Sequence, residues 1–140
     1  IVLAACGLIR LGLEDRITEL IGLDQMLPEP GQGALAIETR DDDKDVVELV
    51  SALEDPVSRA CVDAERAFLK ALGGGCRVPI AAYASCADGT LELQGAVIAP
   101  DGTRQLRDQL SGPMTEPVAL GDRLAAHLSS QGAKDLLQGI

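Results

Sequence analysis

The sequence predicts an α/β protein whose C-terminal part is an α+β domain, a three-stranded antiparallel sheet covered by helices. Two Asp-Gly dipeptides, at residues 88–89 and 101–102, are typical of tight hairpin turns. They separate three strand-like runs, at residues 80–86, 90–99 and 103–111. Apolar residues at helical spacing lie before and after these runs, and such helices cover one face of a sheet.

The first of these helices is expected to begin at Pro56, with Asp55 as its N-cap, and to end at Gly73. The second is expected at residues 117–130. One face of the first helix is apolar, and it comprises Val57, Ala60, Cys61, Ala64, Ala67, Phe68, Ala71 and Leu72. Residues from about 55 onward therefore form a complete small unit.

The first 54 residues do not form such a unit on their own. Residues 1–6 (IVLAAC) have the composition of a buried strand, and residues 7–20 that of a short helix. After a Pro-rich and Gly-rich break, residues 34–40 predict another strand and residues 42–53 a helix with an acidic first turn. We therefore expect the chain to be a fragment in which these are pieces of a larger structure.

Composition excludes several classes of function. The chain has 140 residues and a formal net charge of −10, which disfavours nucleic acid as a partner. Phe68 and Tyr83 are its only aromatic residues, so platforms for stacking bases are poorly supported. An apolar run long enough to cross a membrane is lacking. We expect a soluble, cytoplasmic protein with no membrane partner.

The four cysteines are Cys6, Cys61, Cys76 and Cys86, and no two have C-x-x-C spacing. With His127 as the sole histidine, a metal site is not expected. Cys6, Cys61 and Cys86 lie in strand-like or helical apolar runs and are expected to pack in the core. Cys76 instead follows three glycines, which favour an accessible thiol and hence covalent chemistry, although a tight helix-to-strand turn would also explain them.

Four motifs, in this order and spacing, resemble the C-terminal half of the porphobilinogen deaminase (hydroxymethylbilane synthase) family: VLAACGLIRLGLEDRI, LPEPGQGALAIETR, DAERAFLKALGGGCRVPIAAYA and APDG. The resemblance implies a transferase of porphyrin, tetrapyrrole and heme biosynthesis. This enzyme polymerises four porphobilinogen units, with release of ammonia, into the linear tetrapyrrole hydroxymethylbilane.

The resemblance also implies a division into domains. The family's first two domains resemble the lobes of a periplasmic binding protein. Residues 1–27 would end the second domain, and residues 28–54 would form the hinge and a segment returning to the first. Residues 55–140 would be the third, cofactor-anchoring domain.

The resemblance assigns a cofactor to the glycine loop. The family holds a dipyrromethane through a thioether to the cysteine at this position, which is Cys76. A soft sulfur nucleophile suits the electrophilic methylene-pyrrole that porphobilinogen forms on deamination. Arg77 favours the thiolate, whereas the C-terminus of the preceding helix opposes it.

Further site residues are implied by the same resemblance. Arg10 matches an arginine that binds the acetate and propionate groups of cofactor and substrate, and a guanidinium suits carboxylates; a surface arginine is the alternative. Leu3 and Ala4 match positions whose backbone borders the pyrroles. Gln32 and Gly33 match a hinge near the substrate.

The implied partners are porphobilinogen, the growing polypyrrole chain and the N-terminal domains of the same enzyme. The family's catalytic aspartate lies in those domains, so no catalytic residue is assigned here and the fragment alone is expected to be inactive. Its exposed apolar surface predicts self-association. The alternative function is a non-catalytic module that senses a small ligand or binds a partner through its sheet edge.

Overall fold

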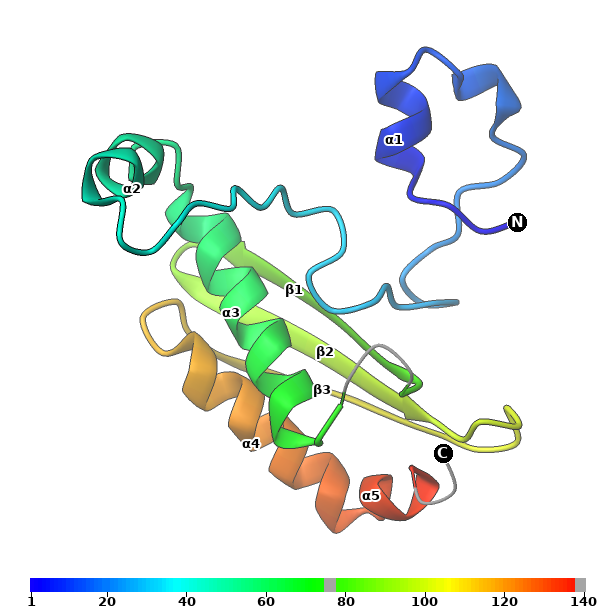
Figure 1. Ribbon diagram of the computed structural model, residues 1–140. Helices are drawn as coiled ribbons and strands as arrows, with labels where there is room; N and C mark the ends of the chain where they lie inside the picture. Colours follow the sequence, from blue (N-terminus) through cyan, green and yellow to red (C-terminus); the bar gives the residue numbers. More distant parts are fainter. Residues whose placement is uncertain (75–77, 138–140) are drawn as a thin grey trace.

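The computed structural model describes residues 1–74 and 78–137. An N-terminal segment with little regular structure precedes a compact unit of helices and strands (Figure 1). The elements in chain order are α1 (Ala5–Arg10), a 3-10 turn η1 (Glu14–Arg16), α2 (Lys44–Ser51), α3 (Pro56–Ala71), β1 (Ile80–Ala87), β2 (Thr90–Ile98), β3 (Gln105–Pro113), α4 (Pro117–Ser130) and α5 (Ala133–Leu136).

The three strands form one antiparallel sheet in the order β1-β2-β3, as the sequence predicts. Asp88 and Gly89 join β1 to β2 with φ angles of 50° and 73°, the left-handed backbone that a two-residue hairpin turn requires. Gly102, with φ of 72°, lies in the loop between β2 and β3. Leu93 of β2 pairs with Ala84 on one side and Leu110 on the other, so β2 is the central strand.

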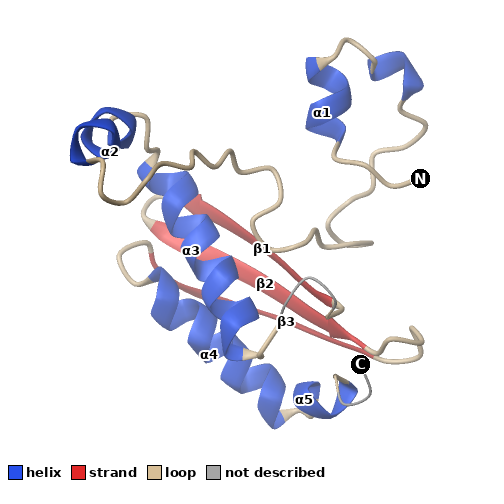
Figure 2. Ribbon diagram, in the orientation of Figure 1, coloured by secondary structure: helices blue, strands red, loops and turns tan. Residues whose placement is uncertain are grey.

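Helices α3 and α4 lie side by side on one face of the sheet (Figure 2). The core fills the space between them and the strands, and its largest fully buried side chains are Phe68, Leu91, Leu93, Val97, Leu120, Leu124 and Leu128. Helix α5 was not predicted; its Ala133 and Leu136 join the same core. The predicted fold class, with helices covering a three-stranded sheet, is confirmed.

Helix α3 begins as predicted, with Pro56 in its first turn and the Asp55 carboxylate accepting from the Ser58 N–H at 2.7 Å. Most of its predicted apolar face is in the core, but Val57 and Ala71 are exposed. These two residues lie in the first and last turns of the helix, while its buried residues lie between them.

The cysteine predictions have mixed outcomes. Cys61 on α3 and Cys86 on β1 are partly buried and pack against the core, as expected. Cys6 is exposed on α1, so the prediction that it packs in a strand is wrong. Cys76 lies outside the described residues.

The two N-terminal strand predictions are wrong. Residues 1–4 are irregular and exposed and lead into α1, and residues 34–40 are irregular and mostly exposed. An isolated strand leaves its backbone groups unpaired, and within the described residues neither segment has a neighbouring strand to pair with. Of the helix predicted at residues 7–20, only η1 and the end of α1 form.

The predicted helix at residues 42–53 forms as the shorter α2, with Asp43 accepting from the Val46 N–H. Large apolar side chains are exposed throughout the N-terminal part of the chain, as predicted: Ile1, Val2, Leu3, Ile9, Leu11, Leu13, Leu35, Ile37, Val46, Val47 and Leu49. Self-association through this surface stays a prediction. Within the described residues, none of the helices has the length and apolarity needed to cross a membrane.

Candidate functional site

The glycine loop after α3 begins with a defined helix stop. Gly73 has φ of 74° and donates its N–H to the Lys70 carbonyl at 3.0 Å, while Gly74 donates to the Leu69 carbonyl at 3.0 Å. This pair of bonds is the Schellman motif. A Cβ on Gly74 would lie 2.9 Å from Ile80 Cδ1, closer than side chains pack. The turn therefore favours glycine at position 73, and a side chain at position 74 would displace the ends of neighbouring side chains and lie 3.1 Å from the Leu69 carbonyl oxygen.

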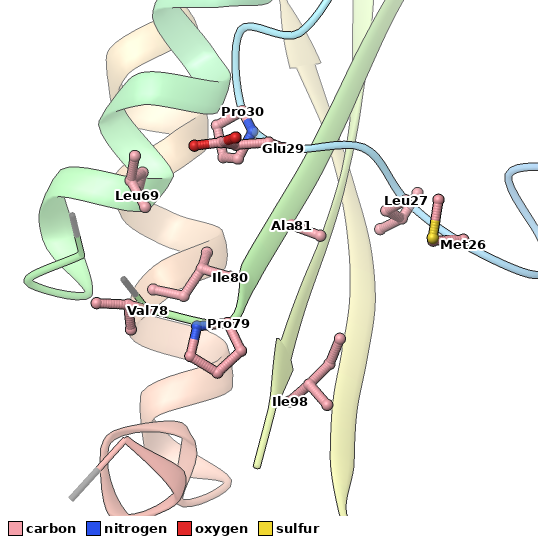
Figure 3. A pocket seen from close by; sticks show the side chains of 10 residues that line it. All are labelled: Met26, Leu27, Glu29, Pro30, Leu69, Val78, Pro79, Ile80, Ala81 and Ile98. Atoms are coloured by element: carbon pink, nitrogen blue, oxygen red, sulfur yellow. The ribbon is translucent and has the colours of Figure 1, made fainter. Parts of the chain in front are cut away.

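A pocket of about 320 Å³ lies beside the continuation of this loop (Figure 3). Cys76 falls outside the described residues, but Val78 and Pro79, which follow it closely, line the pocket. The other lining residues are Met26, Leu27, Glu29, Pro30, Leu69, Ile80, Ala81 and Ile98. Among the described residues of this lining, Glu29 is the one that is charged, and most of the others are apolar.

Two consecutive turns begin at the pocket-lining residues Glu29 and Pro30. The amide of residue 32 donates to the carbonyl of residue 29 at 3.0 Å, and the amide of residue 34 to that of residue 31 at 3.4 Å. Gly31 and Gly33 have φ angles of 79° and 85°. Proline at the second position and a left-handed glycine at the third are the signature of a type II turn. The sequence PGQG thus encodes a double turn that carries Gln32 between its two glycines.

Glu65, on α3, is a buried carboxylate that joins this double turn to the sheet. Its Oε2 accepts from the Gly31 N–H at 2.6 Å, and its Oε1 accepts from the Ala84 N–H at 2.7 Å. Ala84 belongs to the edge strand β1, whose Ala82 N–H donates to the Pro28 carbonyl at 3.0 Å. Glu65 and the segment around Pro28 therefore satisfy donors at the edge of the sheet.

Burial is the main influence on the pKa of Glu65 and raises it; the two backbone N–H groups and the nearby Arg66 lower it and oppose this effect. Glu65 was not among the site residues predicted from the sequence. A signal was present, because Glu65 lies four residues after Cys61 and three before Phe68, on the apolar face of the helix. A carboxylate on a core-facing stripe needs hydrogen-bond partners.

A second contact fixes the segment that precedes the pocket. The Arg107 guanidinium, on β3, donates to the carbonyls of Leu23 and Asp24 at 2.7 and 3.1 Å and to Gln94 Oε1 at 2.8 Å. These bonds hold the chain across the sheet just before Met26 and Leu27 enter the pocket lining. Arg107 was also not singled out by the sequence.

The remaining predicted site residues fall into two groups. Gln32 and Gly33 are exposed in the double turn, next to the pocket-lining Pro30. Leu3, Ala4 and Arg10 are exposed at α1, which lies apart from the sheet in Figure 1. The structure therefore brings Gln32 and Gly33 close to the pocket but not the α1 residues, and their functional roles stay predictions. Among the described residues, no three His, Cys, Asp or Glu side chains gather as a metal site.

Comparison with protein families identifies both parts of the chain. Residues 1–48 match the porphobilinogen deaminase, dipyromethane cofactor binding domain, and residues 59–130 match the porphobilinogen deaminase, C-terminal domain. The second match alone covers half of the chain, including most of α3, the sheet and α4. The chain belongs to the porphobilinogen deaminase family. The resemblance inferred from the four sequence motifs is thereby confirmed.

Individual relatives agree with the family models. The chain is 53% identical to porphobilinogen deaminase of Synechococcus elongatus over its whole length, which covers 44% of that protein. It is 46% identical to the enzyme of Thiobacillus denitrificans, over all of the chain and 46% of the relative. For Roseiflexus castenholzii the identity is 48%, over 99% of the chain and 46% of the relative. The chain spans less than half the length of these relatives.

Proposed function

We propose that this chain is the C-terminal portion of a hydroxymethylbilane synthase, a transferase that joins four porphobilinogen units into a linear tetrapyrrole with release of ammonia. The observation that carries the proposal is the pair of family matches, which lie in order along the chain and include the glycine loop. Residues 1–27 and 28–54 would belong to the two N-terminal domains, and residues 55–140 would form the third.

The residues around the glycine loop fit a covalently held dipyrromethane. The Schellman turn ends α3 at the loop, and Val78 and Pro79 continue directly into a pocket whose described lining, apart from Glu29, offers apolar side chains to pyrrole rings. The thiol in this loop, Cys76, is the proposed attachment residue. Its sulfur replaces the amino group of a porphobilinogen aminomethyl arm, so that a C–S bond forms, a C–N bond breaks and the thiol proton leaves with ammonia. When bound, the cofactor supplies the pyrrole carbon to which substrate units are added.

The other proposed roles concern the acid side chains of cofactor and substrate. The pocket lining offers them no Lys or Arg among the described residues, so the cations must come from elsewhere. Arg10 is the proposed donor to these carboxylates, with the backbone of Leu3 and Ala4 bordering the rings. Gln32 and Gly33 are proposed to contact the substrate from the double turn beside the pocket. The catalytic aspartate is proposed to lie outside this chain, in the N-terminal domains.

The proposal is tested on the full-length protein that contains this sequence. Intact mass should exceed the sequence mass by two pyrrole units, and incubation with porphobilinogen should release ammonia and form hydroxymethylbilane. The Cys76→Ala variant should lack the excess mass. Cys6→Ala is the matched control because Cys6 is an exposed thiol on α1, and it should keep the excess mass. A full-length protein that is folded, unmodified and inactive would favour a non-catalytic binding module instead.

A further inference from the structure

The double turn at Pro30, whose type II form Pro30 and Gly31 favour by sequence, is also held by a contact with α3. A type I and a type II turn differ mainly by rotation of the peptide between their two central residues. That peptide carries the Gly31 N–H, which points at Glu65 Oε2 over 2.6 Å. In a type I turn the same N–H would face away from the carboxylate. The hydrogen bond therefore adds to the sequence's preference for the type II form, in which Gly31 has φ of 79°.

Glu65 is well suited to set this conformation because it is itself held rigidly. It lies on α3 between Ala64 and Phe68, both fully buried in the core. Its second oxygen is fixed by the Ala84 N–H of β1 at 2.7 Å. Because its two oxygens accept from the turn and from β1, Glu65 ties the turn to both α3 and the sheet. A charged acceptor also makes the stronger class of hydrogen bond to a backbone N–H.

The next residue in the turn is Gln32, which is exposed and belongs to the second turn with Gly33. Loss of the bond to Glu65 would release the double turn, and Gln32 with it, from α3 and β1. We infer that Glu65 is a positioning residue, which places Gln32 toward the substrate by fixing the double turn. This inference rests on the proposed function for the direction of Gln32, whereas the fixing of the turn stands on the geometry alone.

The kinetic test uses the full-length protein with its cofactor. Glu65→Gln keeps the size of the side chain but offers one acceptor oxygen where two N–H groups require two. It should lower kcat/KM for porphobilinogen at least tenfold, as should Gln32→Ala. If Glu65 acts through Gln32, the double variant should be no more than threefold worse than the Gln32→Ala variant. Asp63→Asn, on the same helix but more exposed, is the control and should stay within twofold of the natural protein.

Two further measurements separate positioning from folding. Gly31→Ala leaves Glu65 intact and introduces no close contact, since the nearest atom to its Cβ would be Arg66 Nε at 3.9 Å. It strains the positive φ in a surface turn, so it should reproduce the kinetic defect while Tm changes little. Hydrogen exchange at the Gly31 amide should be at least tenfold faster in Glu65→Gln and unchanged in Asp63→Asn.

The outcomes distinguish this inference from the proposed function. Multiplicative effects of Glu65→Gln and Gln32→Ala, or normal kinetics in Gly31→Ala, would overturn the positioning role. Unchanged exchange at Gly31 in Glu65→Gln would overturn the fixing of the turn even in a protein without activity. If the natural full-length protein forms no hydroxymethylbilane, the proposed function fails and the role assigned to Gln32 fails with it, while the exchange result still decides whether Glu65 fixes the turn.

Discussion

The contact between α3 and α4 depends on the absence of a side chain at Gly121. A Cβ at this position would lie 2.7 Å from Ala67 Cβ and 2.8 Å from the Phe68 N atom, and it would also meet the Ala64 carbonyl. Ordinary van der Waals contact begins at 3.4 Å. Two of these three atoms belong to the α3 backbone, which cannot rotate away as a flexible side chain would. Gly121→Ala should therefore push the helices apart.

The change in the free energy of unfolding is the cost of overpacking less the gain in helix propensity. Overpacking of a tight core costs about 1–3 kcal/mol, and the upper part of this range applies because backbone is met on one side and the buried Phe68 cannot yield. Replacing glycine by alanine inside a helix raises the free energy of unfolding by about 1 kcal/mol. The net loss of stability should be about 1–2 kcal/mol. Without the steric contact, Gly121→Ala would stabilise the protein.

Hydrogen exchange of β2 amides in the full-length protein measures this effect, because these amides report opening of this unit rather than of other domains. Exchange should accelerate about 5–30-fold in Gly121→Ala. Ala126→Gly is the matched control, since Ala126 is exposed on the same helix. Its replacement measures only the difference in helix propensity between alanine and glycine. Slower exchange in Gly121→Ala than in the natural protein would refute the close packing of α3 on α4.

Three further predictions concern single side chains. Arg10→Leu in the full-length protein should raise KM for porphobilinogen at least tenfold or abolish cofactor content, and kinetics within twofold of normal would make Arg10 a plain surface charge. Cys61→Ser should lower the free energy of unfolding by about 1–3 kcal/mol because it partly buries a hydroxyl. The variant should keep the excess mass of the cofactor, and loss of that mass in folded protein would contradict attachment at Cys76. Burial raises the pKa of Glu65 in the folded state above its unfolded value of about 4.3. The stability that Glu65 contributes is therefore present below that pH and is lost as the pH rises through the folded pKa. The free energy of unfolding of the natural protein, measured in urea relative to Glu65→Gln, should fall over that interval, and a rise would show that the N–H groups and Arg66 outweigh burial.

The C-terminal unit was predictable because its signals are local and mutually consistent. Asp-Gly turns specify the hairpins, Asp55 and Pro56 specify the start of α3, and the apolar stripes specify the faces that meet the sheet. These elements also find their packing partners within the same stretch of chain. The short α5 was missed because four residues carry too little periodicity to be recognised.

The N-terminal strands were predicted wrongly for the opposite reason. The composition of residues 1–6 and 34–40 favours strands, but a strand forms only where a neighbour satisfies its backbone groups. In the described chain those residues meet no such neighbour, and their apolar side chains are exposed. The composition of these residues therefore suits a sheet whose neighbouring strands are not among the described residues. The match of residues 1–48 to a family domain agrees with this explanation.

The candidate site shows the same division between local and distant signals. The thiol at Cys76 is conspicuous in sequence because three glycines precede it, although the structure assigns the first two glycines to a helix stop and to packing against Ile80. Glu65 is inconspicuous because its two partners, at Gly31 and Ala84, are 34 and 19 residues away. Its importance follows only when the turn, the helix and the edge strand are seen together. A charged residue on an otherwise apolar helix face is therefore the sequence feature to examine when such a contact is sought.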